Sequence, residues 1–159
     1  GYRQLLHDQI MGLIAAGVEA SEIDRPGGIF VRPADQISEE DRILFAGDSF
    51  MPIPYIVDGD LEENLASIKR VARLGLENIV QGHGDIILRG EIDAAVKENL
   101  NYLNAIKKSV KAIARKKNAD ELIEEITIES CGKSRVYLGG LARNLHQRNL
   151  HALLHHMRQ

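Results

Sequence analysis

Residues 43–49 read ILFAGDS, and residues 79–85 read IVQGHGD. Each stretch begins as an apolar run, typical of a buried strand, and ends at a glycine beside a potential metal ligand. The ligand is the carboxylate of Asp48 in the first stretch and the imidazole of His83 in the second. Two strands that end in this way can deliver both donors to one site at the edge of a sheet. The pair therefore indicates a metal site on an α/β fold.

Helical patterns follow both strands. Residues 61–74 carry an apolar stripe, with acidic residues in the first turn and basic residues in the last. Asp58 and Asp60 precede this helix, and we interpret them as caps because the later oxygen ligands of a calcium loop are missing. A longer amphipathic pattern covers residues 91–117, whereas residues 121–128 are acidic and β-branched and favour no single type.

The two ends of the chain also carry amphipathic patterns. Helices are predicted at residues 2–16 and 142–157, and a short strand at residues 28–31. His151 and His155 share one face of the last helix at a spacing that can hold zinc. The glutamate of a metalloprotease helix does not follow the first of them, so we interpret both as surface residues.

In context, the two stretches resemble the second half of the metallo-β-lactamase superfamily. The resemblance runs from about Pro26 to Ile106, in the order GGIFV, ILFAGDSF, DGDLEENLASIKRVARL, NIVQGHGD and NLNYL. It implies an α/β fold equivalent to half of the family's αββα sandwich, with a small mixed sheet covered by helices and extra C-terminal helices. Residues 26–106 would form that half and residues 107–159 a helical extension, within a single domain of residues 1–159.

The resemblance also implies roles for the two donors. In the family, the aspartate of the GD motif bridges two metal ions and the histidine of the GHG motif binds the second ion, and the matching residues are Asp48 and His83. It implies two zinc ions, or iron or manganese in some members, that activate a water for hydrolysis of an ester, thioester, lactam, lactone or phosphodiester. Asp85 is a candidate either for orienting His83 by accepting its ring proton or for ending the loop.

The sequence departs from the family at the rest of the metal site. The family's histidine-x-histidine-x-aspartate-histidine motif is absent, because no histidine occurs between His7 and His83. Where the family usually has a histidine in a GHTPG turn, this sequence has Asp24, whose oxygen is a possible substitute donor. Two protein donors are too few for a catalytic zinc, which ordinarily keeps three. We therefore expect a truncated hydrolase that is inactive as the isolated chain.

Three hypotheses remain open from the sequence. The chain is a fragment or shortened member of the hydrolase family, a non-catalytic half-fold that associates with itself, or a module that binds a partner through its terminal helices. A half-fold exposes an apolar sheet face, so we expect a homodimer or higher oligomer. A small molecule is the expected substrate if the chain is active, and the sequence does not define which one.

Composition bears on the remaining classes. The chain has 159 residues, of which 44% are hydrophobic, enough for the core of one domain. A net charge of -3 gives no general attraction to nucleic acid or to an anionic membrane. No apolar run in the sequence approaches the length of a bilayer span, which is about 18 residues. Basic residues at 107–117 are interpreted as a solvated helix end, with an anionic ligand as the alternative. The single cysteine, Cys131, suits a reducing, cytoplasmic location.

Overall fold

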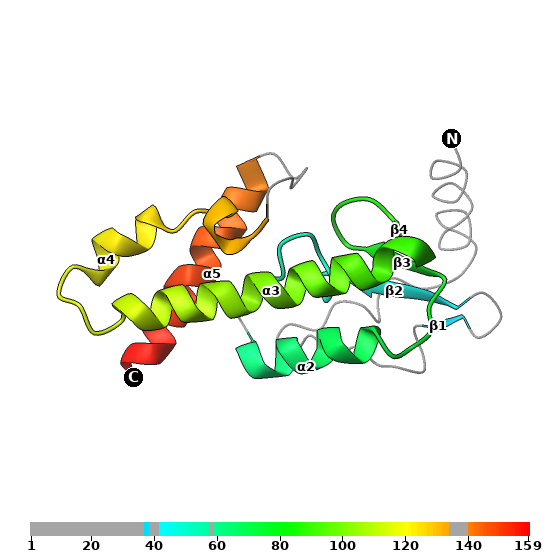
Figure 1. Cartoon of the computed structure of the whole chain (residues 1–159), viewed down its shortest axis with the longest axis horizontal. Coiled ribbons are helices and arrows are strands. Elements are labelled where there is room, and N and C mark those ends of the chain that lie inside the picture. The colour runs from blue at the N-terminus through cyan, green and yellow to red at the C-terminus, as the bar shows by residue number, and fades with distance from the viewer. Residues whose placement is uncertain (1–36, 39–41, 58, 134–139) are drawn as a thin grey trace.

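The computed structural model describes residues 37–38, 42–57, 59–133 and 140–159 of the chain. These residues form a small sheet and a group of helices (Figure 1). The strands are β1 (Ile37–Ser38), β2 (Ile43–Gly47), β3 (Asn78–Gln81) and β4 (Ile87–Leu88). The helices are α2 (Leu61–Val71), α3 (Arg89–Ile113), α4 (Ala119–Leu122) and α5 (Gly140–Arg158), with two 3-10 turns, η2 (Ile123–Glu125) and η3 (Glu129–Cys131). The strand predicted at residues 28–31 and the helix predicted at residues 2–16 lie outside the described residues.

The sheet is mixed, with the spatial order β1, β2, β3 and β4. β2 and β3 are parallel, while β1 and β4 pair antiparallel at the two edges. α2 provides the crossover that a parallel pair of strands requires. The α/β class predicted from the sequence is thus confirmed, and its assignment to half of a metallo-β-lactamase sandwich stays a prediction. The sequence analysis did not predict β4, which has only two residues.

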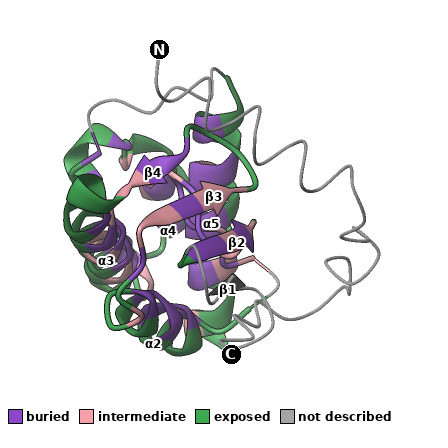
Figure 2. Ribbon diagram, turned by 90° about the vertical axis from the view of Figure 1, so that its right-hand side faces the viewer, coloured by how far each residue is buried: buried purple, intermediate pink, exposed green. Residues whose placement is uncertain are grey.

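Side chains of β2 and β3 alternate between the two faces of the sheet. One face packs into the main hydrophobic core, which it shares with α2, α3 and α5. The other face belongs to a smaller apolar cluster. Figure 2 shows α2 and α3 side by side, with their buried faces turned towards the sheet. The residues of β2 and β3 in the main core are Leu44, Ala46 and Ile79, and the residues of these two strands in the smaller cluster are Ile43, Phe45 and Val80.

Helix boundaries differ from the predicted ones where turns intervene. Asp60 caps α2 as predicted, because its side chain accepts hydrogen bonds from the amides of Glu62 and Glu63 at 2.8 and 2.9 Å. α2 ends at Val71 rather than at residue 74, ahead of Gly75, which has a φ of +62°. α3 ends at Ile113, so the last basic residues of the run lie beyond the helix.

α3 is the longest helix of the described residues. It links the two predicted parts of the domain, residues 26–106 and residues 107–159. It has 25 residues, or about 37 Å at 1.5 Å per residue, and the proposed division after residue 106 falls within it. α2 and α5 both pack against it. Residues 121–128, for which the sequence favoured no type, form the end of α4, η2 and the approach to η3. None of the described helices combines the length and apolar character needed to cross a membrane.

A buried polar chain joins α5 to α3. Asn149 Nδ2 donates to the hydroxyl of Tyr102 at 3.3 Å, and that hydroxyl lies 3.0 Å from Nδ1 of His146. Nε2 of His146 lies 2.9 Å from the carbonyl oxygen of Ile126, which can only accept, so Nε2 carries the ring proton. Nδ1 then accepts from the tyrosine hydroxyl. Neutral His146 therefore forms a hydrogen bond at both ring nitrogens. In protonated His146, Nδ1 would also carry a proton and could no longer accept from the Tyr102 hydroxyl.

We expect the free energy of unfolding to decrease when the pH falls below about 6.5, the ordinary pKa of histidine. Burial lowers the pKa of His146, so the unfolded chain binds a proton more readily than the folded one in this range. The stability due to neutral His146 is therefore complete above its unfolded pKa and is lost as the pH falls through its lowered folded pKa. Urea unfolding at about pH 7.5 and about pH 5.5 measures the difference. His146→Gln should reduce this pH dependence, and an equal dependence in the variant would contradict the assignment.

Candidate metal centre

β2 and β3 end side by side, and the residues that follow them bring the two predicted donors together. The amide of Gly82 donates to the carbonyl of Gly47 at 2.7 Å, which continues the parallel pairing to the ends of both strands. Oδ1 of Asp48 then lies 3.6 Å from Nε2 of His83. The carboxylate and the imidazole thus meet at one edge of the sheet.

Two glycines allow this approach. A Cβ at Gly82 would lie 2.2 Å from Oδ1 of Asp48 and 2.7 Å from the carbonyl carbon of Gly47, so a side chain has no room there. Gly84 has a φ of +102°, a conformation strained for other residues, and a Cβ there would lie 2.9 Å from Pro52. The glycines on either side of His83 therefore let two loops pack together. We call them the site loops, residues 48–57 after β2 and residues 82–86 after β3.

The distance between the donors suits a shared metal ion. Two ligand atoms each about 2.1 Å from a tetrahedral ion lie about 3.4 Å apart. The observed separation of Asp48 Oδ1 and His83 Nε2 is 3.6 Å. The side chains of Asp48 and His83 are 65% and 50% exposed respectively, so both are accessible from solvent. Carboxylate oxygen and imidazole nitrogen are both zinc ligands, so the donor chemistry fits the predicted metal.

Further donors do not join this pair within the described residues. There, no group of three or more histidine, cysteine, aspartate or glutamate side chains is placed to hold a metal ion. Asp85 is exposed, and its backbone carbonyl accepts from Nε2 of Gln81 at 2.6 Å. No hydrogen bond of the described residues joins its carboxylate to His83. Asp24, the other predicted donor, lies outside the described residues.

The histidines of α5 have partners other than a metal. Nε2 of His151 lies 2.9 Å from a carboxylate oxygen of Glu124, and Nε2 of His155 accepts from the amide of Gln159 at 2.9 Å. Because each ring bonds a different residue, the pair forms no common site. This arrangement agrees with their interpretation as surface residues.

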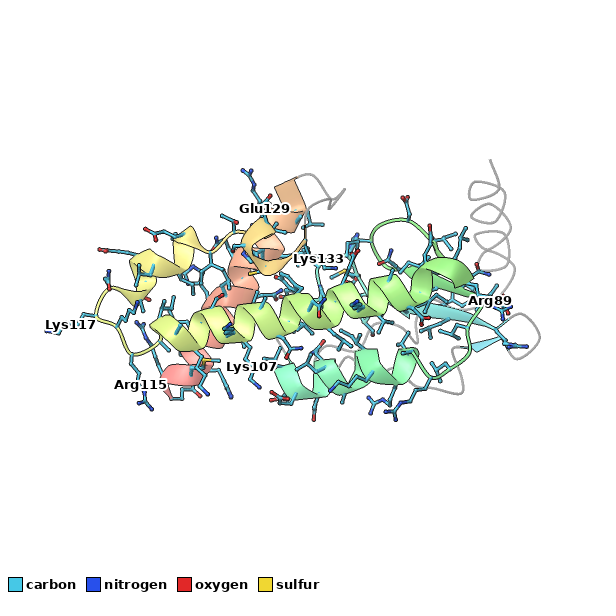
Figure 3. All side chains as sticks on the ribbon, viewed as in Figure 1. Arg89, Lys107, Arg115, Lys117, Glu129 and Lys133 are labelled. Carbon is cyan, nitrogen blue, oxygen red and sulfur yellow. The ribbon has the colours of Figure 1, made fainter. Side chains whose placement is uncertain are left out.

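The basic residues near the end of α3 point in several directions. Lys107 forms an ion pair with Glu62 of α2. Arg115 and Lys117 extend outward beyond the last turn of the helix (Figure 3). They do not converge on one position, so this part of the chain agrees with a solvated helix end. Cys131 is buried and free, and burial raises the pKa of its thiol, which disfavours the reactive thiolate.

Two buried asparagines on helices bind the backbone of the first site loop. Neither was predicted from the sequence. Asn99 of α3 donates to the carbonyl of Met51 at 3.0 Å. Asn149 of α5 donates to the carbonyl of Pro54 at 2.7 Å and accepts from the amide of Ile56 at 3.0 Å. Each asparagine lies on the apolar face of its helix. An amide inside an apolar stripe is the sequence signal that could have identified both.

No protein-family model matches this sequence, and no curated protein matches it significantly. Functional assignment therefore depends on the geometry of Asp48 and His83 and on the motifs that carry the family resemblance.

We expect Gly82→Ala to lower the free energy of unfolding by about 1–3 kcal/mol, the range for overpacking at a site without free space. The new methyl group would collide with Asp48 and Gly47 and force the strand ends apart. Gly90→Ala is the matched control, since nothing lies within 4 Å of a Cβ there and the residue is helical. It should be neutral or stabilise by up to about 1 kcal/mol. Urea unfolding of both variants tests this, and equal stability would show that the strand ends are not tightly apposed.

Proposed function

We propose that this chain is the C-terminal half of a metal-dependent hydrolase of the metallo-β-lactamase superfamily, with Asp48 and His83 as zinc ligands. The observation that carries the proposal is the 3.6 Å approach of Asp48 Oδ1 to His83 Nε2 where two adjacent parallel strands end. The order of the motifs around both residues supports it. The substrate is proposed to be a small molecule.

Each residue of the site has a defined part in this proposal. Zinc, or iron or manganese in its place, would supply Lewis-acid chemistry and a water of lowered pKa for hydrolysis. Asp48 and His83 would hold the metal, and Gly82 and Gly84 would keep both side chains accessible. A catalytic zinc ordinarily has three protein ligands, so the centre needs another donor, for which Asp24 is the candidate in this chain. The isolated chain is therefore proposed to bind zinc but to lack hydrolase activity.

Zinc binding tests the proposed ligands. Isothermal titration of the chelator-treated full chain should show that Asp48→Asn and His83→Gln each weaken zinc binding by at least about tenfold, which is about 1.4 kcal/mol. Asp24→Asn should weaken it as well if that carboxylate completes the centre. His151→Gln is the control, because this exposed histidine bonds Glu124 instead. Zinc affinity that is unchanged in both Asp48→Asn and His83→Gln would refute the proposed centre.

A second candidate function is a non-catalytic module that associates with itself or with a partner. The smaller apolar cluster of the sheet favours it, because Phe45, Val80 and Leu88 pack against Ile43 and Ile86 but remain only partly buried. We propose that this face of the sheet mediates a homodimer or higher oligomer. A cytoplasmic location stays a prediction, with which the free thiol of Cys131 is compatible.

Light scattering coupled to size-exclusion chromatography tests the association. The full chain at micromolar concentration should elute as a dimer or larger species, and Val80→Lys should shift it to the monomer by placing a charge in the apolar face. Leu141→Lys is the control, because this leucine is 41% exposed on α5, away from the sheet. A monomeric full chain would exclude this role for the cluster.

A further inference from the structure

A small pocket lies close to the candidate metal centre, between the first site loop, the ends of β3 and β4, and α3. Its volume is about 150 Å³. Apolar side chains form much of its wall, and among the described residues Glu98 and Lys133 are the charged ones that line it. The lining residues are Phe50, Met51, Pro52, Gln81, Ile87, Ala95, Glu98, Asn99 and Lys133.

Lys133 is the unusual member of this wall. It follows η3 close to the middle of α3 (Figure 3), and it is only 7% exposed. Its ammonium group donates to the side-chain oxygen of Asn99, whose amide is in turn held by the carbonyl of Met51. Asn99 thus fixes the lysine head group against the pocket and ties it to the first site loop.

The ammonium group has unused bonding capacity. Lys133 Nζ carries three donors, and among the described residues Asn99 is its only hydrogen-bond partner. No carboxylate of the described residues lies within ion-pair distance of Nζ, although Glu98 attracts it through space. Burial lowers the pKa of Lys133 to about 8, so the group is still mostly charged at neutral pH. A buried cation without a partner anion destabilises a fold unless a ligand compensates it.

Size and charge narrow the class of ligand. A volume of about 150 Å³ corresponds to about five water molecules at about 30 Å³ each, which suits an acid of about four carbons. Glu98 adds one negative charge to the wall, and this disfavours a multiply charged anion such as phosphate relative to a monoanion. Phe50, Met51 and Ile87 offer an apolar surface to a short hydrocarbon chain.

We propose that this pocket binds a small aliphatic monocarboxylate, whose carboxylate pairs with Nζ of Lys133 and whose hydrocarbon chain packs on the apolar wall. The site goes beyond the proposed metal chemistry, because it needs neither zinc nor Asp48 and His83. Its failure and the failure of the metal centre are therefore separate results.

Binding is measured on the chelator-treated full chain by NMR, with sodium butyrate as the probe and the methyl signals of Met51 and Ile87 as the readout. Butyrate should shift both signals saturably. Butyramide, which has the same shape without the charge, should bind at least about tenfold more weakly, because a charge-assisted bond is lost. Inorganic phosphate should also bind more weakly than butyrate. Equal binding of butyrate and butyramide, or tighter binding of phosphate, would overturn the proposal.

Variants separate the charge of the lysine from the space of the pocket. Lys133→Met should reduce butyrate affinity by at least about tenfold, and Ala95→Leu should do the same by filling the pocket while the lysine remains. Lys111→Met, which changes an exposed lysine of α3, is the control. Glu98→Gln should strengthen binding severalfold by removing the nearby negative charge, an effect that a purely structural lysine would not produce. Wild-type affinity in Ala95→Leu or in a folded Lys133→Met protein would refute the site.

The pH profile gives an independent readout. Butyrate affinity should decline as the pH rises through about 8, because deprotonated Lys133 no longer attracts a carboxylate. The site loops and β4 contribute no ionisable side chain to the wall, and Glu98 of α3 is the other charged group that the described part of the chain places there. In Glu98→Gln the decline is expected at a lower pH, because the negative charge of Glu98 raises the pKa of Lys133. A flat profile in both proteins would contradict the role of Lys133.

Discussion

The hydrogen bond from the Gly82 amide to the Gly47 carbonyl is the constraint on which the rest of this site depends. It forms because β2 and β3 are parallel neighbours whose pairing, after a shift of register between Phe45 and Gly47, continues to Gly47 and Gln81. Parallel strands place their carboxyl ends at the same edge of the sheet, so the residues that follow them share one surface. Asp48 and His83 come together for this reason, although α2 separates them in the sequence. At Gly82 the two segments lie so close together that a Cβ would be 2.7 Å from the carbonyl carbon of Gly47.

Beneath this edge, the helices act as a support for the first site loop. Carbonyl and amide groups of such a loop cannot stay buried without partners. Asn99 and Asn149 supply those partners from α3 and α5, and Tyr102 and His146 connect the second asparagine to the core. The C-terminal helix therefore belongs to the same packed unit as the sheet, and one hydrophobic core includes residues from Leu44 to Leu154.

The sequence predicted those parts whose cause is local. The apolar runs predicted β2 and β3, and the aspartate before Leu61 predicted the start of α2. The glycines around Asp48 and His83 also predicted that these side chains lie together, as they do, whereas their role as metal ligands stays a prediction. The sequence did not predict β4, because two residues are too few to show the alternation of a strand. β4 also depends on its pairing with β3.

The contacts of Asn99, Asn149 and Lys133 were not predicted for a different reason, although the apolar stripe around each asparagine marks it as buried. Each depends on contacts between segments that are distant in the sequence, and asparagine and lysine are residue types that are mostly exposed. Helix ends were uncertain by a few residues because turns and glycines, rather than the apolar period, determine where a helix stops. The family assignment itself stays a prediction, since the missing histidine motif removes the part of the sequence that would test it most directly.

Asn149 has a consequence for how such a protein diverges. It binds the first site loop at a residue 93 positions earlier in the chain, so the path of that loop is set by a helix near the C-terminus. Substitutions on the inner side of α5 can therefore reshape the first site loop while Asp48 and His83 themselves stay the same. In descendants of this sequence, changes in the shape of that loop would then accumulate far along the chain from the residues that they move.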